Sequence, residues 1–501
     1  MDLLIIFLLF LPFFIIISFL LQKFKTRNSV NRWPPGPPGL PFIGNLHQLD
    51  NSHRPRYFWK LSKQYGPFMS LRLGFVPTLV VSSAKMAKEI LKTHDLHFCS
   101  RPPLLGIYTL SYGGSDLAFA PYNDHWRELK KICTIHLFNS VKVQQFRPMR
   151  EDEVSRMIQN ISKSASSSTP VNLSKLMTSL TIAVTCRVAF GKRFGDEGIE
   201  KNRFHALLHE TQDGFGSFYL GDYFPFLGWV DKLFTGQIRR LQNTFKKLDV
   251  FYQQIIDEHL DPKRRKTEEE DILDVLLQLK KDRSFKVDLT WDHIKGLLMN
   301  IFIAGADTAA ITVIWAMTYL MKNPRTMRKA QEEIRTLIGN KGFVDEDDVQ
   351  KLPYLKAVAK EAMRLQPAVP ILPPREAIEK CNIEGYEIPV KTRVYVNAWA
   401  VGRDPEAWDK PEEFCPERFM DGSIDFKGQN FELIPFGGGR RICAGMYMGL
   451  GLLELALANL LYKFEWELPP GMKTGDLDFE ALPGMAVYKK NPLCLVAKNY
   501  V

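Results

Sequence analysis

Residues 435–445, PFGGGRRICAG, decide the fold, and they lie near the C-terminus of a chain of 501 residues. Three consecutive glycines permit backbone conformations that other residues resist, so the segment can turn tightly and bring its backbone close to a flat ligand. Its N–H groups can point at the sulfur of Cys443, and a helix is predicted just after it. These features, with Arg440 and Arg441, predict a lowered pKa for the thiol. A thiolate held in this way suits haem iron, whereas a buried cysteine beside a glycine-rich turn is the alternative.

The cysteine pattern argues against a disulfide framework and against a zinc site. The number of cysteines is odd, their spacings are wide, and no C-x-x-C pair occurs. We therefore predict a reducing compartment, in which most cysteines are small buried apolar side chains and at most one carries chemistry. The cysteines are Cys99, Cys133, Cys186, Cys381, Cys415, Cys443 and Cys494.

The chain is basic, with a formal net charge of +10 at pH 7. The excess is scattered, and no basic stripe is interleaved with aromatic residues, which argues against a nucleic-acid partner. The densest basic run, residues 263–266, is followed at once by the acidic run 268–271. This segment is interpreted as a solvated loop between helices rather than as a nuclear localisation signal.

The N-terminal segment has the composition of a membrane anchor. Residues 3–21 are almost entirely apolar, and as a helix they would span roughly 28 Å, close to the ~30 Å hydrocarbon core of a bilayer. A cleaved signal peptide is the alternative, but a basic start and a small-residue cleavage site are missing. The positive charges follow the span, so the rest of the chain is predicted to face the cytosol. Glycosylation at Asn160 or Asn172 would contradict this orientation.

The sequence predicts three parts. Residues 1–22 form a transmembrane anchor, residues 23–41 a basic linker and proline-rich hinge, and residues 42–501 one large globular domain. Most of this domain is predicted to be helical, with small strand pairs in residues 71–82, 385–401 and 485–497. The longest helix is predicted to begin at an N-cap, Thr290, and to end at Lys322 before a proline.

The middle of this long helix, residues 304–308 with the sequence AGADT, is unusual for a buried segment. A glycine inside a helix costs about 1 kcal/mol relative to alanine, and a buried aspartate is costly unless it is paired. On this segment alone, a functional site is no better supported than a structural arrangement. In the structural arrangement Thr308 would bond back to its own helix, and Asp307 would be paired elsewhere.

The glycine-rich segment resembles the haem loop of the cytochrome P450 family, F-x-x-G-x-R-x-C-x-G, at Phe436, Gly439, Arg441, Cys443 and Gly445. The resemblance extends over nearly the whole chain and is greatest to the plant microsomal group. It implies a mainly α fold with small β-sheets, in which a single large haem domain follows an N-terminal transmembrane helix. The implied cofactor is haem b, with the Cys443 thiolate as the axial ligand of its iron and the other four residues against the haem.

A second family signature, E-x-x-R, matches Glu361 and Arg364. Residues three apart on a helix share a face, so the two side chains are expected to meet. The resemblance implies that they join Arg418 in a buried network, which holds the scaffold on the haem side and requires every member to be satisfied. Gln366 departs from the histidine that plant relatives often have at this position.

The two haem propionates require cationic and hydrogen-bonding partners. The resemblance assigns this role to Trp126, Lys130, Arg375 and Arg441. Lys130 stands where the family usually has arginine, so its contact is expected to be that of a point charge. Arg127 is the alternative at this position.

The oxygen-activating motif of the family, [AG]-G-x-[DE]-T, matches Ala304, Gly305, Asp307 and Thr308. The resemblance gives the last two catalytic roles: Thr308 orders a water beside the reacting oxygen, and Asp307 relays protons. Gly305 is expected to leave room above the iron.

The resemblance implies a monooxygenase that inserts one atom of molecular oxygen into a small apolar plant metabolite. The chain has no phosphate-binding loop of its own, so electrons are expected from NADPH through a separate cytochrome P450 reductase, with cytochrome b5 as a further candidate donor. A basic face around Arg127, Lys130, Lys131 and Arg440 is expected to attract this acidic flavoprotein. The expected location is the endoplasmic reticulum membrane, with a single span and a cytosolic catalytic domain.

Two other functions use the same haem site. An aldoxime dehydratase or another non-oxygenating enzyme would not need NADPH, and a haem protein that senses or carries a ligand at the membrane would not turn over with any donor. The substrate is left open among aldoximes and other amino-acid derivatives, terpenoids, and phenolics or coumarins. The segments expected to line its pocket are residues 104–119, 215–227, 297–308, 369–372 and 482–487.

Overall fold

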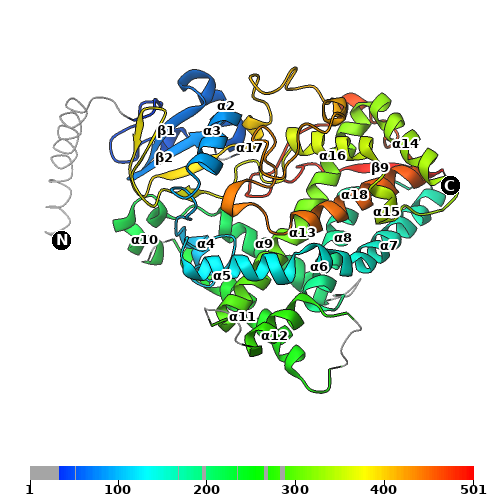
Figure 1. The fold of residues 1–501 in the computed structure, drawn as a ribbon, viewed down its shortest axis with the longest axis horizontal. Coiled ribbons are helices and arrows are strands. Elements are labelled where there is room, and N and C mark those ends of the chain that lie inside the picture. The colour runs from blue at the N-terminus through cyan, green and yellow to red at the C-terminus, as the bar shows by residue number, and fades with distance from the viewer. Residues whose placement is uncertain are drawn as a thin grey trace, which may run out of the picture.

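The computed structural model describes residues 33–50, 52–167, 169–193, 199–233, 235–264, 269–282 and 288–500. The predicted transmembrane anchor, residues 1–22, and the start of the predicted linker lie outside these residues. Within them the chain is mainly helical, and the main sheet lies on one side, beside α2 (Arg54–Tyr65), α3 (Ala84–Lys88) and α17 (Ala398–Val401) (Figure 1). The predicted fold class, mainly α with small sheets, is confirmed.

The helix α13 (Trp291–Lys322) runs through the middle of the helical part (Figure 1). It begins after the N-cap Thr290 and ends at Lys322, with Asn323 as the C-cap before Pro324, as the sequence predicts. Most of its length is buried, and its most extensive packing is against α8 (Leu173–Phe190). It also packs against α16 (Pro353–Leu365) and α18 (Met446–Lys463), so residues far apart in sequence share one hydrophobic core.

The remaining helices surround this core. They are α4 (Leu105–Leu110), α5 (Asp124–Ile132), α6 (Ser140–Gln145), α7 (Arg147–Ser166), α9 (Ile199–Gly216), α10 (Gly228–Leu233), α11 (Gln237–Leu260), α12 (Ile272–Asp282), α14 (Pro324–Ile338) and α15 (Glu346–Val349). Among the described helices, α8 and α13 are long and apolar enough to cross a bilayer. Both are mostly buried inside the protein, so we interpret them as core helices.

The main sheet has the strand order β1-β2-β7-β4. The predicted hairpin in residues 71–82 is confirmed as β1 (Phe68–Leu73) paired with β2 (Val76–Val81). The predicted hairpin in residues 385–401 is wrong. Its two halves pair elsewhere: β6 (Tyr386–Ile388) with β5 (Cys381–Ile383), and β7 (Arg393–Val396) with β2 in parallel.

The predicted C-terminal hairpin in residues 485–497 is also wrong. A single strand, β9 (Cys494–Asn499), pairs with β8 (Phe464–Glu467) and with β3 (Val171–Asn172). The short strand β4 (Arg375–Glu376) closes the main sheet beside β7. These pairings join segments that are far apart in the chain, which local alternation of apolar residues does not specify.

The described end of the proline-rich stretch lies against β1. The N–H of Ser70 donates to the carbonyl of Pro35 at 2.8 Å, and its hydroxyl donates to the carbonyl of Pro34 at 2.6 Å. Gly36 approaches so closely that a Cβ at this position would lie 1.9 Å from the carbonyl oxygen of Ser70. Residues 34–36 are therefore packed against β1.

We expect Thr290→Ala to lower the free energy of unfolding by about 1 kcal/mol, because it removes the N-cap of α13. The hydroxyl of Thr290 accepts from the N–H of His293 at 3.3 Å, and the ring of His293 accepts from the N–H of Thr290 at 3.2 Å. Thr290→Ser keeps the cap and should retain most of the stability. Denaturant unfolding of the three proteins measures the difference, and equal losses in both variants would contradict the capping role.

Candidate functional site

The glycine-rich segment folds into a tight loop that ends at Cys443. The N–H of Cys443 donates to the carbonyl of Phe436 at 3.0 Å, which closes the loop. Gly439 has a φ of +65°, and a Cβ there would lie 2.2 Å from the carbonyl oxygen of Leu91 and 2.6 Å from Oδ1 of Asp95. Glycine is therefore required at this position both for its backbone conformation and for the close approach.

The side chain of Cys443 has free space around it although it lies inside the protein. Its residue is exposed by surface area, yet desolvation raises the pKa of its thiol. A hydrogen bond from the N–H of Gly445 and the charge of Lys130 act in the opposite direction. The predicted lowering of the thiol pKa is wrong for this structure, because desolvation outweighs both effects. The predicted helix after the cysteine is confirmed as α18, which begins at Met446.

Arginine side chains gather behind this loop. Arg441 donates to the carbonyls of Cys99 at 2.7 Å, Leu117 at 3.2 Å and Ala120 at 2.7 Å. Arg375 is buried and donates to the carbonyl of Gly438 at 2.7 Å. The loop and the strand β4 are thereby tied to the segment before α5.

These cations repel one another in a desolvated environment. Desolvation and the nearby charge of Arg375 lower the pKa of Arg441 to about 9. Desolvation and the charges of Arg441 and Arg375 also lower the pKa of Arg101, which is buried. Asp95 bonds to Arg375 at 2.9 Å and Asp116 is the other nearby acid, so the cluster has more positive than negative groups. An anionic group bound here would relieve this repulsion.

The helix α5 adds two residues to the same place. The guanidinium of Arg441 lies 4.0 Å from the centre of the Trp126 ring, whose Nε1–H donates to the carbonyl of Leu117 at 2.8 Å. The Nζ of Lys130 donates to the carbonyl of Ile442 at 3.2 Å, and desolvation lowers the pKa of this amine. Arg127 instead lies at the surface in an ion pair with Asp124, so the structure does not bring it into this cluster.

In the middle of α13, Ala304 is exposed, although most residues of this helix are buried. The hydroxyl of Thr308 donates to the carbonyl of Ala304 at 3.0 Å and remains partly accessible. A Cβ on Gly305 would lie 2.6 Å from the hydroxyl oxygen of Thr185 in α8. The expected role of Gly305 is therefore wrong: the glycine allows α13 and α8 to pack closely, and the free space lies beside Ala304.

Asp307 has partners that its sequence motif does not indicate. Its side chain is buried, and it accepts a hydrogen bond from Nε2 of Gln212 in α9. The same Nε2 donates to the hydroxyl of Tyr488 at 2.8 Å, and that hydroxyl is also hydrogen-bonded to Asp307. Both new residues border segments that were expected to line the pocket, which is the only sequence signal that could have indicated them.

Those pocket segments meet in the structure. The rings of Phe119 and Phe215 pack edge to face with their centroids 5.4 Å apart. The N–H of Leu105 donates to the carboxylate of Asp222 at 2.8 Å. The N–H of Val487 donates to the carbonyl of Ala368 at 2.9 Å, which joins the C-terminal segment to the segment after α16.

The E-x-x-R pair forms the predicted network. Glu361 and Arg364 are fully buried, and Nε of Arg364 lies 2.6 Å from Oε2 of Glu361. Arg418 joins them, with its Nε 3.2 Å from Oε1 of Glu361. Gln366 is buried just after the end of α16.

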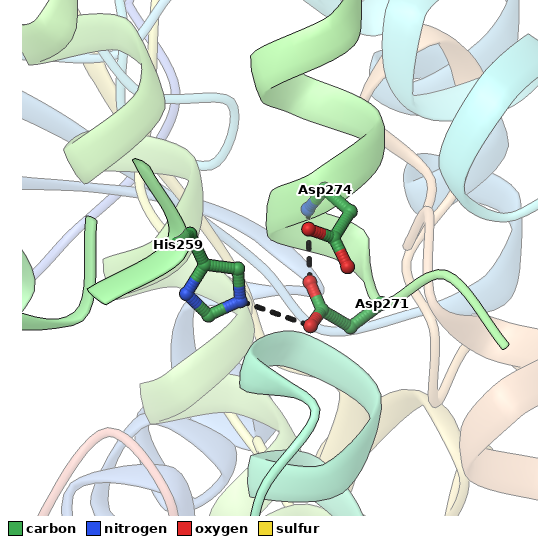
Figure 2. A group of neighbouring side chains, drawn as sticks. All are labelled: His259, Asp271 and Asp274. Carbon is green, nitrogen blue, oxygen red and sulfur yellow. Dashed lines mark hydrogen bonds and ion pairs between the residues drawn. The ribbon is translucent and has the colours of Figure 1, made fainter. Parts of the chain in front are cut away.

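A second group of polar side chains lies where α11 meets α12 (Figure 2). His259, Asp271 and Asp274 form the one set of potential metal ligands that lie close together among the described residues. Arg264 already donates to Asp271 at 2.8 Å and to Asp274 at 2.6 Å, and His259 bonds to Asp271 at 2.9 Å. The guanidinium of Arg264 therefore already supplies a positive charge to this group. We interpret the group as a set of contacts that joins α11 to α12. The predicted solvated loop is wrong at this end, because Asp271 is fully buried.

The sequence and the fold match known proteins over most of their length. The profile of the family "Cytochrome P450" matches residues 34–495. A 6,7,8-trihydroxycoumarin synthase of Pastinaca sativa is 51% identical over 98% of both chains. A 5-OH-xanthotoxin synthase of the same plant is 49% identical over 100% of both, and cytochrome P450 71B34 of Arabidopsis thaliana is 48% identical over 99% of both. A zebra fish cytochrome P450 structure with progesterone is 26% identical, with a TM-score of 0.76 over 89% of this chain and 99% of that one.

Members of this family hold a haem iron through a thiolate and need both a redox partner and a small substrate. The named plant relatives are hydroxylases and synthases. The chain therefore belongs to the cytochrome P450 family, and it is a monooxygenase of plant specialised metabolism.

Proposed function

We propose that Cys443 is the axial thiolate ligand of a haem b, and that the haem lies between the glycine-rich loop and the Ala304 side of α13. The observations that support this most strongly are the accessibility of Cys443, whose thiol is nevertheless desolvated by surrounding protein, and the accessibility of Ala304 within the core helix α13. The matched loop residues Phe436, Gly439 and Gly445 belong to the same haem-binding segment. To bind iron, the Cys443 thiol would lose the proton that desolvation favours, and the positive charge of the iron would compensate the resulting thiolate.

We propose that the haem propionates bind to the cationic cluster of Arg441, Arg375, Lys130 and Trp126. Three of these residues are cations, and desolvation lowers the pKa of each. Two carboxylates would neutralise part of this charge, so the residues fit the group that the family carries. The indole N–H of Trp126 now donates to a backbone carbonyl and would have to reorient to reach a propionate directly.

A bound haem would supply oxygen activation, and the residues of α13 would control the proton supply. The hydroxyl of Thr308 can rotate from the carbonyl of Ala304 to hold a water in the neighbouring space. Burial raises the pKa of Asp307, so this carboxyl group retains a proton at a higher pH than an exposed aspartate. We propose that Asp307 delivers this proton toward Thr308 and that both residues are catalytic.

The proposed location is the endoplasmic reticulum membrane, with a single span and a cytosolic catalytic domain. The proposed electron donor is a separate NADPH–cytochrome P450 reductase, and cytochrome b5 is a second proposed donor. Arg127, Lys131 and Arg440 are exposed or partly exposed near the Cys443 loop and offer positive charge to an acidic flavoprotein. The charge attraction predicts that reduction slows as salt increases. Salt-independent reduction would contradict this docking face.

The proposed substrate is a flat phenolic molecule of the coumarin class. The names of two relatives from Pastinaca sativa, which are about half identical to this chain, refer to a trihydroxycoumarin and to a hydroxylated xanthotoxin. The aromatic pair Phe119–Phe215 belongs to segments expected to line the pocket and is suited to contact with a flat ring system.

The proposed function is tested by supplying the membrane-bound enzyme and its reductase with NADPH, labelled molecular oxygen and xanthotoxin or a dihydroxycoumarin. A monooxygenase transfers one labelled oxygen atom to the product, and no product forms when NADPH is omitted. Loss of water from an aldoxime without NADPH would instead support a dehydratase. Absence of turnover with any donor would support a ligand-binding haem protein.

We expect Arg441→Ala to reduce the haem content of the purified protein several-fold, because it removes a propionate partner and leaves backbone carbonyls without donors, at about 1–3 kcal/mol for each buried group. Arg440→Ala is the matched control, since Arg440 is about half exposed and pairs with Asp95 at 3.2 Å. The ratio of haem to protein measures the effect. Equal haem loss in both variants would contradict the assignment of Arg441.

A further inference from the structure

The carboxyl group of Asp307 is held by a closed set of hydrogen bonds. Nε2 of Gln212 donates one hydrogen to Oδ2 of Asp307 and the other to the hydroxyl of Tyr488 at 2.8 Å. The hydroxyl of Tyr488 also interacts with the carboxyl group of Asp307 and lowers its pKa. Both N–H donors of the Gln212 amide are thereby used, one on Asp307 and one on Tyr488.

The two oxygens of Asp307 differ in their surroundings. Oδ2 accepts the hydrogen bond from Gln212, while Oδ1 is buried without a hydrogen-bond partner. When the carboxyl group is protonated, its hydrogen therefore belongs on Oδ1, because a donor already points at Oδ2. A buried polar atom without a partner is costly, and a catalytic role or a bound water is among the explanations for such an atom.

The two partners come from segments that border the pocket. Gln212 lies in α9, just before residues 215–227, and Tyr488 directly follows residues 482–487. The backbone beside Tyr488 is fixed, because the carbonyl of Val487 accepts from Nε1 of Trp315 at 3.3 Å and its N–H donates to the carbonyl of Ala368. Asp307 is thus the point at which α13, α9 and the C-terminal segment meet.

We propose that Gln212 and Tyr488 are positioning residues that hold Oδ2 of Asp307 and thereby present Oδ1 as the oxygen that releases the proton used in catalysis. This inference rests on the proposed function of Asp307. When the proton leaves Oδ1, the resulting carboxylate keeps both hydrogen bonds, which stabilise its charge until a proton from solvent replaces the one released. Without these donors the carboxyl group would hold its proton more tightly and release it more slowly.

The test uses the holoenzyme with its reductase and three variants: Tyr488→Phe, Gln212→Met and Asp307→Asn. NADPH oxidation in the absence of substrate is measured in H2O and in D2O. We expect Tyr488→Phe and Gln212→Met each to slow NADPH oxidation by about tenfold and to increase the solvent isotope effect. This is a part of the ~10²–10⁴-fold rate enhancement that a positioned acid contributes. Tyr386→Phe is the matched control, because this tyrosine lies in β6, in the separate strand pair of β5 and β6.

A double variant separates positioning from general damage to the fold. If Tyr488 acts only through Asp307, adding Tyr488→Phe to Asp307→Asn should slow the reaction no further. An equal slowing in both backgrounds would overturn the proposal.

Infrared spectroscopy supplies a readout that does not depend on turnover. The C=O stretching band of a protonated carboxyl group should disappear in Asp307→Asn, shift in Tyr488→Phe and Gln212→Met, and stay unchanged in Tyr386→Phe. A band that does not shift in Tyr488→Phe and Gln212→Met would overturn the inference. If the enzyme failed to oxidise NADPH at all, the proposed function would fail while a shifted band would still support the contacts of Asp307.

Discussion

Replacing Arg364 with alanine is expected to lower the free energy of unfolding by about 3–5 kcal/mol, because it leaves a buried carboxylate without its main partner. Arg364 and Glu361 are fully buried, and two bonds of 2.6 and 2.8 Å join them. Arg364 also donates to the carbonyls of Pro411 at 2.7 Å and Glu413 at 3.0 Å, so these groups lose a donor as well. This is among the largest losses that a single substitution causes.

The matched control is Arg240→Ala, which removes an arginine from an exposed ion pair. Arg240 and Asp213 lie 3.1 Å apart with side chains 71% and 64% exposed, and such pairs contribute about 0–1 kcal/mol. Denaturant unfolding followed by tryptophan fluorescence compares the two variants. If Arg364→Ala does not accumulate as folded protein, Glu361→Gln, which keeps the side-chain volume, gives the same comparison. Similar losses for buried and exposed pairs would show that the network is not needed for the fold.

Thr308→Val is expected to lower product formation by about tenfold to a hundredfold while NADPH oxidation continues and hydrogen peroxide accumulates. Valine keeps the branched shape of the side chain and removes only the hydroxyl that would hold a water beside the reacting oxygen. The electrons are then consumed without oxygen transfer. The ratio of product to NADPH consumed measures this effect directly.

Thr312→Val is the control, because it removes the same group one turn further along α13. The hydroxyl of Thr312 donates to the carbonyl of Thr308 at 2.9 Å, and its residue is buried. A hydroxyl that only bonds back to its helix adds little to stability, so the ratio should remain close to that of the unchanged enzyme. Equal loss in both variants would mean that the hydroxyl of Thr308 has no special role.

The features that depend on local sequence were predictable. The N-cap at Thr290 and the proline after Asn323 set the ends of α13, and both act within one turn of the helix. The pairing of Glu361 with Arg364 follows from their spacing on α16. The loop before Cys443 was indicated by glycines whose conformation other residues resist.

The features that depend on distant contacts were not predictable. The rotation of α13 about its own axis decides that Gly305 faces Thr185 of α8, and this rotation cannot be read from one sequence. The contacts of Asp307 with Gln212 and Tyr488 join three separate segments, and no motif connects them. The raised pKa of Cys443 results from desolvation by the folded chain, which a reading of neighbouring charges alone underestimates.

Cys443 is proposed to bind the haem iron through an anionic sulfur. The most direct measurement is the absorption spectrum of the reduced, haem-loaded protein with carbon monoxide. We expect the unchanged protein and Cys415→Ala, a control cysteine outside the glycine-rich loop, to show the band that marks a thiolate ligand, and Cys443→Ala to lack it. A haem-loaded, unchanged protein without this band, or a Cys443→Ala variant that keeps it, would contradict the account.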